Sequence, residues 1–203
     1  MVRVAIIDYG VGNLRSLEKA FVAAGAAAIV SGDEKILRRA RALVLPGVGA
    51  FGACMKELSD RGFDQLVVER VAEGIPVLGV CVGMQLLFEE SEEFGRTKGL
   101  GLLRGEVRRF DDGLVVPHVG WNQVRIRREH RLFDGVDDRS FFYFVHSYFC
   151  EPKNDELILG TTDYGINYAS IVGKENVIGV QFHLEKSQQA GLRLLQNFTK
   201  YGQ

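Results

Sequence analysis

Cysteine is scarce in this sequence, and its scarcity argues against a fold held together by disulfides. The chain contains three cysteines, Cys54, Cys81 and Cys150, an odd number that cannot pair completely within one molecule. Their separations match no spacing that is typical of metal ligands. We therefore expect a reduced, cytoplasmic environment and no metal site.

Long apolar runs, strong net charge and internal repeats are also missing. The longest apolar runs are far shorter than the roughly 20 residues that cross a bilayer as a helix, and residues 1–7 have the pattern of a strand rather than of a signal peptide. A net charge of −1 gives no reason to expect a nucleic acid or an anionic membrane as a partner. Because no linker-like or low-complexity tract divides the chain, residues 1–203 are predicted to form one domain.

The first half of the chain alternates between two kinds of apolar pattern. Short, almost wholly apolar segments are followed by segments whose apolar residues recur at helical spacing. This alternation predicts a parallel sheet that is covered by helices on both faces. The predicted strands are 4–7, 28–31, 42–45 and 77–80, and the predicted helices are 14–24, with Asn13 as N-cap and Gly25 as terminator, 51–58 and 63–72.

The second half is rich in strand patterns separated by turn residues. Its predicted strands are 102–110, 124–127, 141–149, 157–162, 168–172 and 177–182, and a last helix is expected from a cap at Ser187 to Tyr201. We therefore predict an α/β fold: a single-domain, three-layer sandwich with a mostly parallel sheet, a flavodoxin-like core and an antiparallel β extension. Ligand sites of such sheets lie at the carboxyl ends of the parallel strands.

One of those strand ends carries the sequence Gly79-Val80-Cys81-Val82-Gly83, between a strand pattern and a helical pattern. With serine in place of cysteine, this arrangement is the nucleophile elbow, a tight turn whose flanking positions need glycine. A cysteine there lies at the N-terminus of the following helix, where the helix dipole favours the reactive thiolate. A packed, inert cysteine would produce the same five residues, so the rest of the chain has to supply a base.

The best candidate for that base is His183, at the end of a predicted strand and two residues before Glu185. If this segment is extended, the two side chains point the same way. The carboxylate of Glu185 could then orient the imidazole while its other nitrogen faces the Cys81 thiol. A surface histidine and glutamate at a strand end remain the alternative. His130, which lies in a charged stretch, is expected to be a solvated surface residue.

Oxyanion donors are expected from the loop Pro46-Gly47-Val48-Gly49. Its glycines allow the backbone to approach a ligand closely and to turn an N–H toward a developing negative charge. The N–H of Val82, just after the cysteine, could provide a second donor. A phosphate-binding loop is less well supported because no Gly-Lys-Ser/Thr follows, and Gly10-Val11-Gly12 lacks the third glycine of a dinucleotide fingerprint.

The chain resembles the class I, triad-type glutamine amidotransferases. The segments that carry this resemblance are 79–85 and 182–185. Three further segments are similar to the glutaminase subunits of imidazole glycerol phosphate synthases: Asp8-Tyr9-Gly10-Val11-Gly12-Asn13-Leu14, Pro117-His118-Val119-Gly120-Trp121-Asn122 and Phe144-Val145-His146-Ser147-Tyr148. The match runs nearly from end to end with its motifs in family order, which makes the combination far more specific than any single motif.

The resemblance implies a role for particular residues. It implies Cys81 as nucleophile, His183 as general base and then acid, and Glu185 as the carboxylate that orients it. Oxyanion donors would come from Val48, Gly49 and Val82. Glutamine would be bound by Gly47, Gly49, Gln85, Glu93, Ser147 and Tyr148, and a partner would be contacted by Asn13, His118, Trp121, Tyr143 and Lys186.

The resemblance also implies an activity and a partner. Such a subunit hydrolyses glutamine to glutamate and ammonia through a cysteine thioester, with no cofactor and no metal. It passes the ammonia to a (β/α)8-barrel cyclase subunit, with which it forms a heterodimer. The cyclase makes imidazole glycerol phosphate and AICAR in histidine biosynthesis. Glutaminase activity is expected to be low until the cyclase site is occupied, because the oxyanion loop must reorient.

One departure and two alternatives accompany this interpretation. The family usually has proline between the triad histidine and glutamate, where this chain has Leu184; leucine keeps the spacing but does not stiffen the segment. Another triad amidotransferase, such as the glutaminase of pyridoxal phosphate synthase or of anthranilate synthase, fits segments 8–14 and 117–122 less well. A non-catalytic subunit that only binds a barrel partner would be expected to lack triad residues, and all three are present.

Overall fold

Five short parallel strands form the centre of the protein. The computed structural model describes residues 3–111 and 113–202. The strands lie in the order β2-β1-β3-β4-β13, and neighbours in this set run parallel. This is the strand order of flavodoxin-like sheets, so the predicted flavodoxin-like core is confirmed. They are β1 (Arg3–Ile7), β2 (Ala27–Ser31), β3 (Ala42–Leu45), β4 (Val77–Val80) and β13 (Val177–Val180).

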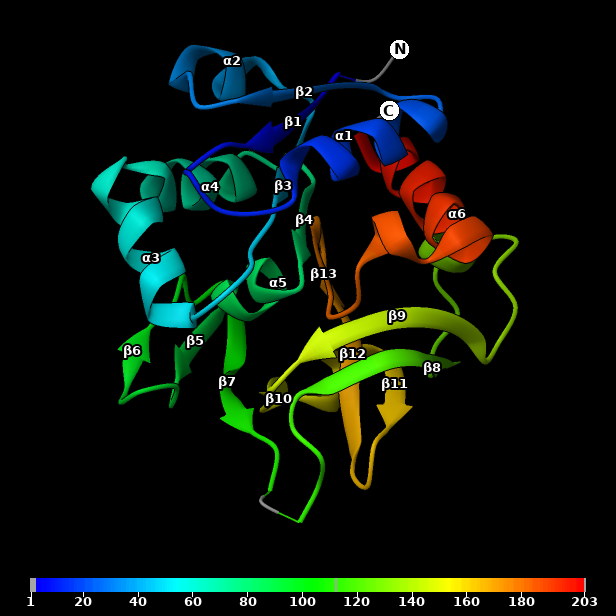
Figure 1. The fold of residues 1–203 in the computed structure, drawn as a ribbon. Coiled ribbons are helices and arrows are strands. Elements are labelled where there is room, and N and C mark those ends of the chain that lie inside the picture. Colours follow the sequence, from blue (N-terminus) through cyan, green and yellow to red (C-terminus); the bar gives the residue numbers. More distant parts are fainter. Residues whose placement is uncertain (1–2, 112, 203) are drawn as a thin grey trace.

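Helices on both faces of this sheet complete a three-layer sandwich (Figure 1). α1 and α6 pack together on one face, and α2, α3 and α4 lie on the other. Every residue of β3 and β4 is buried, and this two-sided burial explains their continuous apolar sequences. Within the described residues no helix has the length and apolarity needed to cross a membrane. The helices are α1 (Leu14–Ala23), α2 (Glu34–Arg39), α3 (Phe51–Asp60), α4 (Phe63–Ala72), α5 (Val82–Leu86) and α6 (Gln188–Thr199).

An antiparallel extension continues from β13, as predicted. β12 pairs with β13, and β10 and β7 follow; β11, β8 and β9 branch from β12 and place the β8–β9 ribbon in front of the sheet (Figure 1). Short 3-10 helices connect several of these strands: η1 (Arg131–Phe133), η2 (Asp155–Leu157), η3 (Leu184–Lys186) and η4 (Lys200–Gly202). The strands are β5 (Phe88–Ser91), β6 (Thr97–Lys98), β7 (Leu103–Arg109), β8 (His118–Ile126), β9 (Ser140–His146), β10 (Tyr148–Pro152), β11 (Ile158–Asp163) and β12 (Asn167–Lys174).

Some predicted strands were wrong in extent. β8 begins at His118 rather than at residue 124, and the predicted strand 141–149 is two strands, β9 and β10, that are separated at Ser147. The first residues of β8 form no apolar run; they are held by seven register pairs with β9, and such cross-strand contacts leave little trace in local sequence. The short elements α2, β5 and β6 were not predicted at all.

The predicted end of α1 is confirmed, but two predicted caps are not. Gly25 has a left-handed backbone (φ +86°) and its N–H donates to Val22 O, which closes the helix. Neither Asn13 nor Ser187 makes a side-chain capping hydrogen bond. The Ser187 hydroxyl instead donates to the His183 carbonyl oxygen (2.6 Å) and accepts from the Tyr143 N–H (3.1 Å).

The backbone between β4 and α5 predicts a severe effect for one small substitution. A Cβ atom at Gly83 would lie 1.9 Å from the carbonyl oxygen of Leu45, so Gly83→Ala must displace β3 or α5. We expect this change to lower the free energy of unfolding by about 3 kcal/mol or more, measured by urea unfolding followed by circular dichroism. Gly113→Ala is the control, because a Cβ there meets nothing within 4 Å. Two variants of equal stability would contradict the prediction.

Candidate active site

Cys81 occupies a strained turn between β4 and α5. Its backbone has φ 56° and ψ −116°, a conformation that a residue with a side chain rarely adopts. The neighbouring glycines make the turn possible: a Cβ at Gly79 would lie 2.5 Å from the Gly83 carbonyl oxygen. The Cys81 N–H donates to Val180 O (2.8 Å), which ties the turn to β13. This is the geometry of a nucleophile elbow.

His183 and Glu185 lie at the same edge of the sheet as Cys81. β4 and β13 are parallel neighbours, so the segments that follow them, with Cys81 and His183, emerge side by side. The His183 Nδ1–H donates to Glu185 Oε1 (3.0 Å), and His183 lines the same pocket as Cys81. The predicted extended segment is wrong, because residues 184–186 form the 3-10 helix η3; the tight turn brings the two side chains together instead. Leu184 is buried within it.

The pKa of His183 reflects its two partners. Burial lowers this pKa, but the hydrogen bonds and charges of Cys81 and Glu185 outweigh burial and raise the pKa to about 10. These two partners therefore favour the positively charged form of the ring. An imidazolium at this position can give a proton to a departing group while the sulfur attacks as an anion.

The loop 46–49 lies directly against the Cys81 turn. A Cβ at Gly47 would lie 2.6 Å from the Gly83 N atom, so only glycine allows this approach. Two side chains hold the carbonyl groups of this loop: the Tyr9 hydroxyl donates to Pro46 O (2.6 Å), and the Cys54 thiol donates to Val48 O (3.3 Å). Because the C=O and N–H of one trans peptide point in opposite directions, the Gly49 N–H points away from Cys54.

A pocket of about 290 Å³ brings most of the predicted site residues together. Cys81 and His183 lie at its wall with loop 46–49 and α5. Gly47 and Glu185 do not line it. Gly47 packs against Gly83, and Glu185 hydrogen-bonds to His183. The predicted residues that line it are Val48, Gly49, Cys81, Val82, Gln85, Glu93, Ser147, Tyr148 and His183.

Three residues of this pocket were not among those predicted: Pro117, Val145 and His146. They belong to the segments 117–122 and 144–148, so the resemblance marked their neighbourhood without assigning them a role. His146 is buried, and its Nδ1–H donates to the Tyr148 carbonyl oxygen (2.8 Å). Local sequence patterns hold no signal for these contacts, because they form between strands.

The outer face of the β8–β9 ribbon is apolar and exposed. Val119 (57% exposed), Trp121 (46%) and Val145 (36%) lie on it, together with Tyr143, which is paired with Trp121 in register and packs edge-on against it at 5.9 Å. Phe141 is exposed at the far end of β9. We define these five residues as the ribbon face.

The predicted partner residues divide into two groups. Trp121 and Tyr143 belong to the ribbon face, Lys186 lies over the Tyr143 ring at 5.3 Å, and Asn13 is exposed. His118 differs from the prediction: it is only 4% exposed, and its Nδ1 lies 3.2 Å from His146 Nε2, beneath the ribbon.

His130, which was expected to be a solvated surface residue, is partly buried instead, and its ring hydrogen-bonds with the Tyr201 hydroxyl (2.8 Å).

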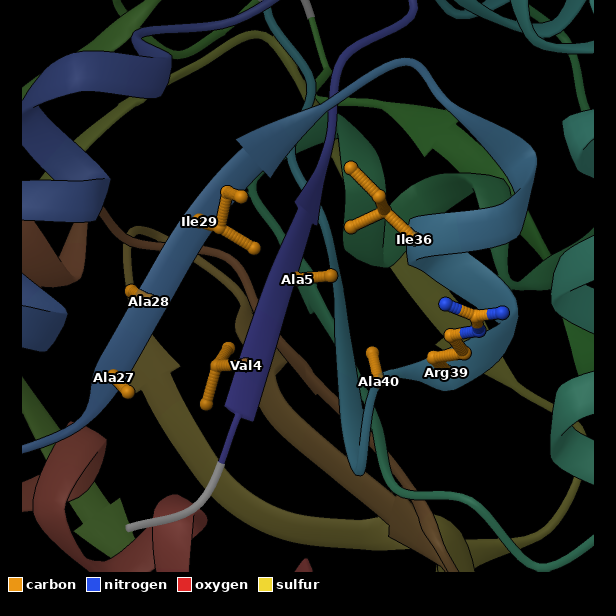
Figure 2. A pocket seen from close by; sticks show the side chains of 8 residues that line it. All are labelled: Val4, Ala5, Ala27, Ala28, Ile29, Ile36, Arg39 and Ala40. Atoms are coloured by element: carbon orange, nitrogen blue, oxygen red, sulfur yellow. The ribbon is translucent and has the colours of Figure 1, made fainter.

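Another pocket, of about 340 Å³, lies far from this chemistry, between β2, β1 and α2 (Figure 2). Its side chains are small or aliphatic except for Arg39, so it holds neither a nucleophile nor a base. Across residues 3–111 and 113–202, no group of three or more His, Cys, Asp or Glu side chains could hold a metal ion. Nucleophilic chemistry is thus best supported at Cys81.

The buried His146 predicts a loss of stability in acid. Burial lowers the pKa of this histidine from 6.5 to about 3, so between these values the unfolded chain binds a proton that the folded chain does not. Stability therefore falls as the pH drops from 6.5 toward 3, by about 5 kcal/mol at most from this group.

The test compares urea unfolding of the wild type and His146→Gln at pH 7, 6, 5 and 4. We expect the wild type to lose more of its pH 7 stability than the variant, which has no proton to gain at this position. If the two curves of stability against pH run parallel, His146 does not contribute in this way.

Comparison with known proteins places the chain in a family. The family model described as glutamine amidotransferase class-I matches residues 5–201. The chain is 46% identical over 206 residues to the imidazole glycerol phosphate synthase subunit HisH of Geobacter metallireducens, with 98% of each chain covered. It is 50% identical over 200 residues to the HisH subunit of Symbiobacterium thermophilum, covering 98% of this chain and 94% of the relative.

Solved structures show the same fold. A crystal structure of a glutamine amidotransferase matches with a TM-score of 0.78 and 20% identity, and PurLQS of Thermotoga maritima matches with a TM-score of 0.76 and 17% identity. Each of these matches covers 98% of both chains. The chain therefore belongs to the class I glutamine amidotransferase family and, within it, to the HisH family of imidazole glycerol phosphate synthase subunits.

Proposed function

We propose that this chain, acting as one domain over residues 1–203, hydrolyses glutamine to glutamate and ammonia for imidazole glycerol phosphate synthase. It passes the ammonia to a cyclase partner that makes imidazole glycerol phosphate and AICAR in histidine biosynthesis, in the cytoplasm. The observation that carries the proposal is the convergence of Cys81, the His183–Glu185 pair and loop 46–49 on one pocket. The names of its relatives support the same activity.

The first half of the reaction forms a thioester. The Cys81 thiolate attacks the side-chain amide carbon of glutamine, and the carbonyl oxygen becomes an oxyanion. The N–H of Val82, with those of Val48 and Gly49, would stabilise this charge. His183 then gives its proton to the amide nitrogen, the C–N bond breaks, and ammonia leaves. Glu185 keeps the ring oriented and stabilises its positive form.

The second half releases glutamate. A water molecule gives a proton to the now neutral His183 and attacks the thioester carbon. The C–S bond breaks, which returns the Cys81 thiolate beside the His183 imidazolium. The raised pKa of His183, about 10, fits this resting state.

Glutamine would be oriented by the far wall of the pocket. Both hydrogens of Gln85 Nε2 are engaged, by Tyr148 O (3.0 Å) and by Gln181 Oε1 (3.1 Å), so its carbonyl oxygen is the atom left to accept from the substrate. The Glu93 carboxylate, which accepts from the Phe51 N–H, would attract the α-ammonium group. Gly49, Ser147 and Tyr148 would complete the site with backbone groups, and Gly47 would position the loop that carries Gly49.

The ribbon face is the surface that we assign to the cyclase partner, a (β/α)8 barrel that forms a heterodimer with this chain. Exposed aromatic residues grouped on one face are typical of a protein interface. The inner edge of the same ribbon touches the site: Tyr143 O accepts from the His183 N–H (2.9 Å), and Val145 O lies 3.9 Å from Cys81 Sγ. Ammonia released there would stay away from bulk water, which would protonate it.

Binding of the partner would also control the oxyanion loop. In this chain Val48 O is held by the Cys54 thiol. A loop reorientation that breaks this bond would turn the peptide N–H groups of residues 48–49 toward the oxyanion, and Gly47 and Gly49 make such a rotation inexpensive. The ribbon, which contacts both Cys81 and His183, is the element through which a docked cyclase would act.

A glutamate-release assay tests the proposed function. We expect little turnover by the isolated chain and a rise of at least about tenfold when the barrel cyclase and its nucleotide ligand are added, because the oxyanion donors are then completed. No glutamate from the complex would refute the glutaminase. Full turnover by the isolated chain would refute the coupling alone.

Titrating the cyclase in the same assay tests the ribbon face. Trp121→Ala should raise the cyclase concentration needed for half-activation by about 30-fold, the effect of losing a central aromatic contact. Val22→Ala, at an exposed position of α1 (57% exposed), should leave it unchanged. Equal titration curves for the two variants would place the partner elsewhere.

A further inference from the structure

Gln181 is a wholly buried polar residue that takes no part in the bond-making or proton-transfer steps of the proposed reaction. It directly follows β13, two residues before His183, and none of its surface is exposed. Its backbone N–H donates to Ser170 O (2.9 Å). Its side-chain Nε2 lies 3.8 Å from Cys81 Sγ, and its Oε1 lies 3.1 Å from Gln85 Nε2. The side-chain amide of Gln181 therefore lies between Gln85, which lines the pocket, and the sulfur of Cys81.

A single carbonyl oxygen dictates which way this amide faces. Tyr148 O can only accept a hydrogen bond, so the Gln85 atom 3.0 Å from it must be the donor, Nε2. The other hydrogen of that Nε2 then donates to Gln181, which must present its oxygen. The opposite end of the Gln181 amide, facing Cys81, is consequently its NH₂ group.

His146 reinforces the same anchor. Its Nδ1–H donates to Tyr148 O, leaving Nε2 as the acceptor in the neutral ring. The Tyr168 hydroxyl lies 3.1 Å from that Nε2 and can donate to it. Tyr148 O thus accepts from two buried side chains at once, and the orientations of Gln85 and Gln181 are set by a network with little freedom to invert.

We propose that Gln181 is a positioning residue for the nucleophile, whose Nε2–H donates to the Cys81 sulfur and stabilises its anionic form. A hydrogen bond to a charged atom is stronger than one to a neutral atom. The bond would therefore be strongest in the thiolate and weaker in the thioester, whose sulfur carries no charge. Gln181 would thereby favour the thiolate as attacking group and as leaving group. The catalytic part of this inference rests on the proposed glutaminase, whereas its effect on the Cys81 sulfur does not.

Two substitutions distinguish the effect of the Nε2–H donor from the effect of the rest of the Gln181 side chain. Gln181→Glu keeps an oxygen that can accept from Gln85 but replaces the donor with a carboxylate oxygen, which repels a thiolate. Gln181→Met keeps a similar volume and removes both polar ends. Gln65→Glu makes the same chemical change on the exposed side of α4 and serves as the control. The ionisable groups around the sulfur stay in place in all three variants: Tyr9, Cys54, Glu93, His146, Cys150 and His183.

The experiment measures alkylation of the full chain by iodoacetamide across a pH series, with the Cys81 peptide followed by mass spectrometry. We expect both Gln181 variants to alkylate Cys81 about tenfold more slowly at neutral pH, as for loss of a hydrogen bond to a charged group. The pH midpoint should move upward, furthest in Gln181→Glu, while Gln65→Glu matches the wild type. A merely structural role would not move this midpoint.

Circular dichroism identifies variants that have lost the fold, and if Gln181→Glu unfolds, Gln181→Met decides the question. In the assembled complex, the folded variants should lose kcat for glutamine with little change in KM. Wild-type alkylation profiles in a folded variant would overturn the proposal. If the wild-type complex releases no glutamate while the alkylation profiles shift, the glutaminase fails and the positioning role stands.

Discussion

The backbone turn at Cys81 is the constraint on which the rest of this site depends. The positive φ of Cys81 places its sulfur at the carboxyl edge of the sheet. This turn can form only because Gly79 and Gly83 have no side chain, since a Cβ at either position would overlap backbone atoms. The same lack of side chains brings Gly47 against Gly83. The Cys81 turn and loop 46–49 are thus packed backbone against backbone at Gly47 and Gly83.

Parallel strands and an antiparallel ribbon contribute different parts of the site. Loop 46–49, Cys81 and His183 follow the carboxyl ends of β3, β4 and β13, which lie at one edge of the sheet. The β8–β9 ribbon closes the pocket from outside, with the His183 N–H bonded to β9 on its inner edge and aromatic side chains on its outer face. The exposed aromatic face and the contacts with Cys81 and His183 therefore lie on the same pair of strands, so a partner docked there would have a direct physical route to the pocket.

The elements predicted best are those whose signal is local. Residues 42–45, 63–72 and 77–80 were predicted with their observed bounds because their apolar patterns reflect burial within the layers. The cysteine turn was recognisable because it needs glycine at fixed positions. The start of β8, the 3-10 turn after His183 and the network of Gln181 and His146 escaped prediction, since they depend on strand pairing and on partners distant in sequence. Ser187 resembles a helix cap in sequence, yet its hydroxyl serves the triad segment.

We propose that Cys81 attacks the side-chain amide carbon of a bound glutamine. The most direct measurement treats the chain, assembled with its cyclase, with the glutamine analogue diazo-oxo-norleucine and maps the adduct by mass spectrometry. Cys54 and Cys150, both buried away from the pocket lining, are internal controls. We expect one adduct, on Cys81, and we expect excess glutamine to suppress it. A Cys81 peptide without adduct, or equal labelling of the three cysteines, would contradict it.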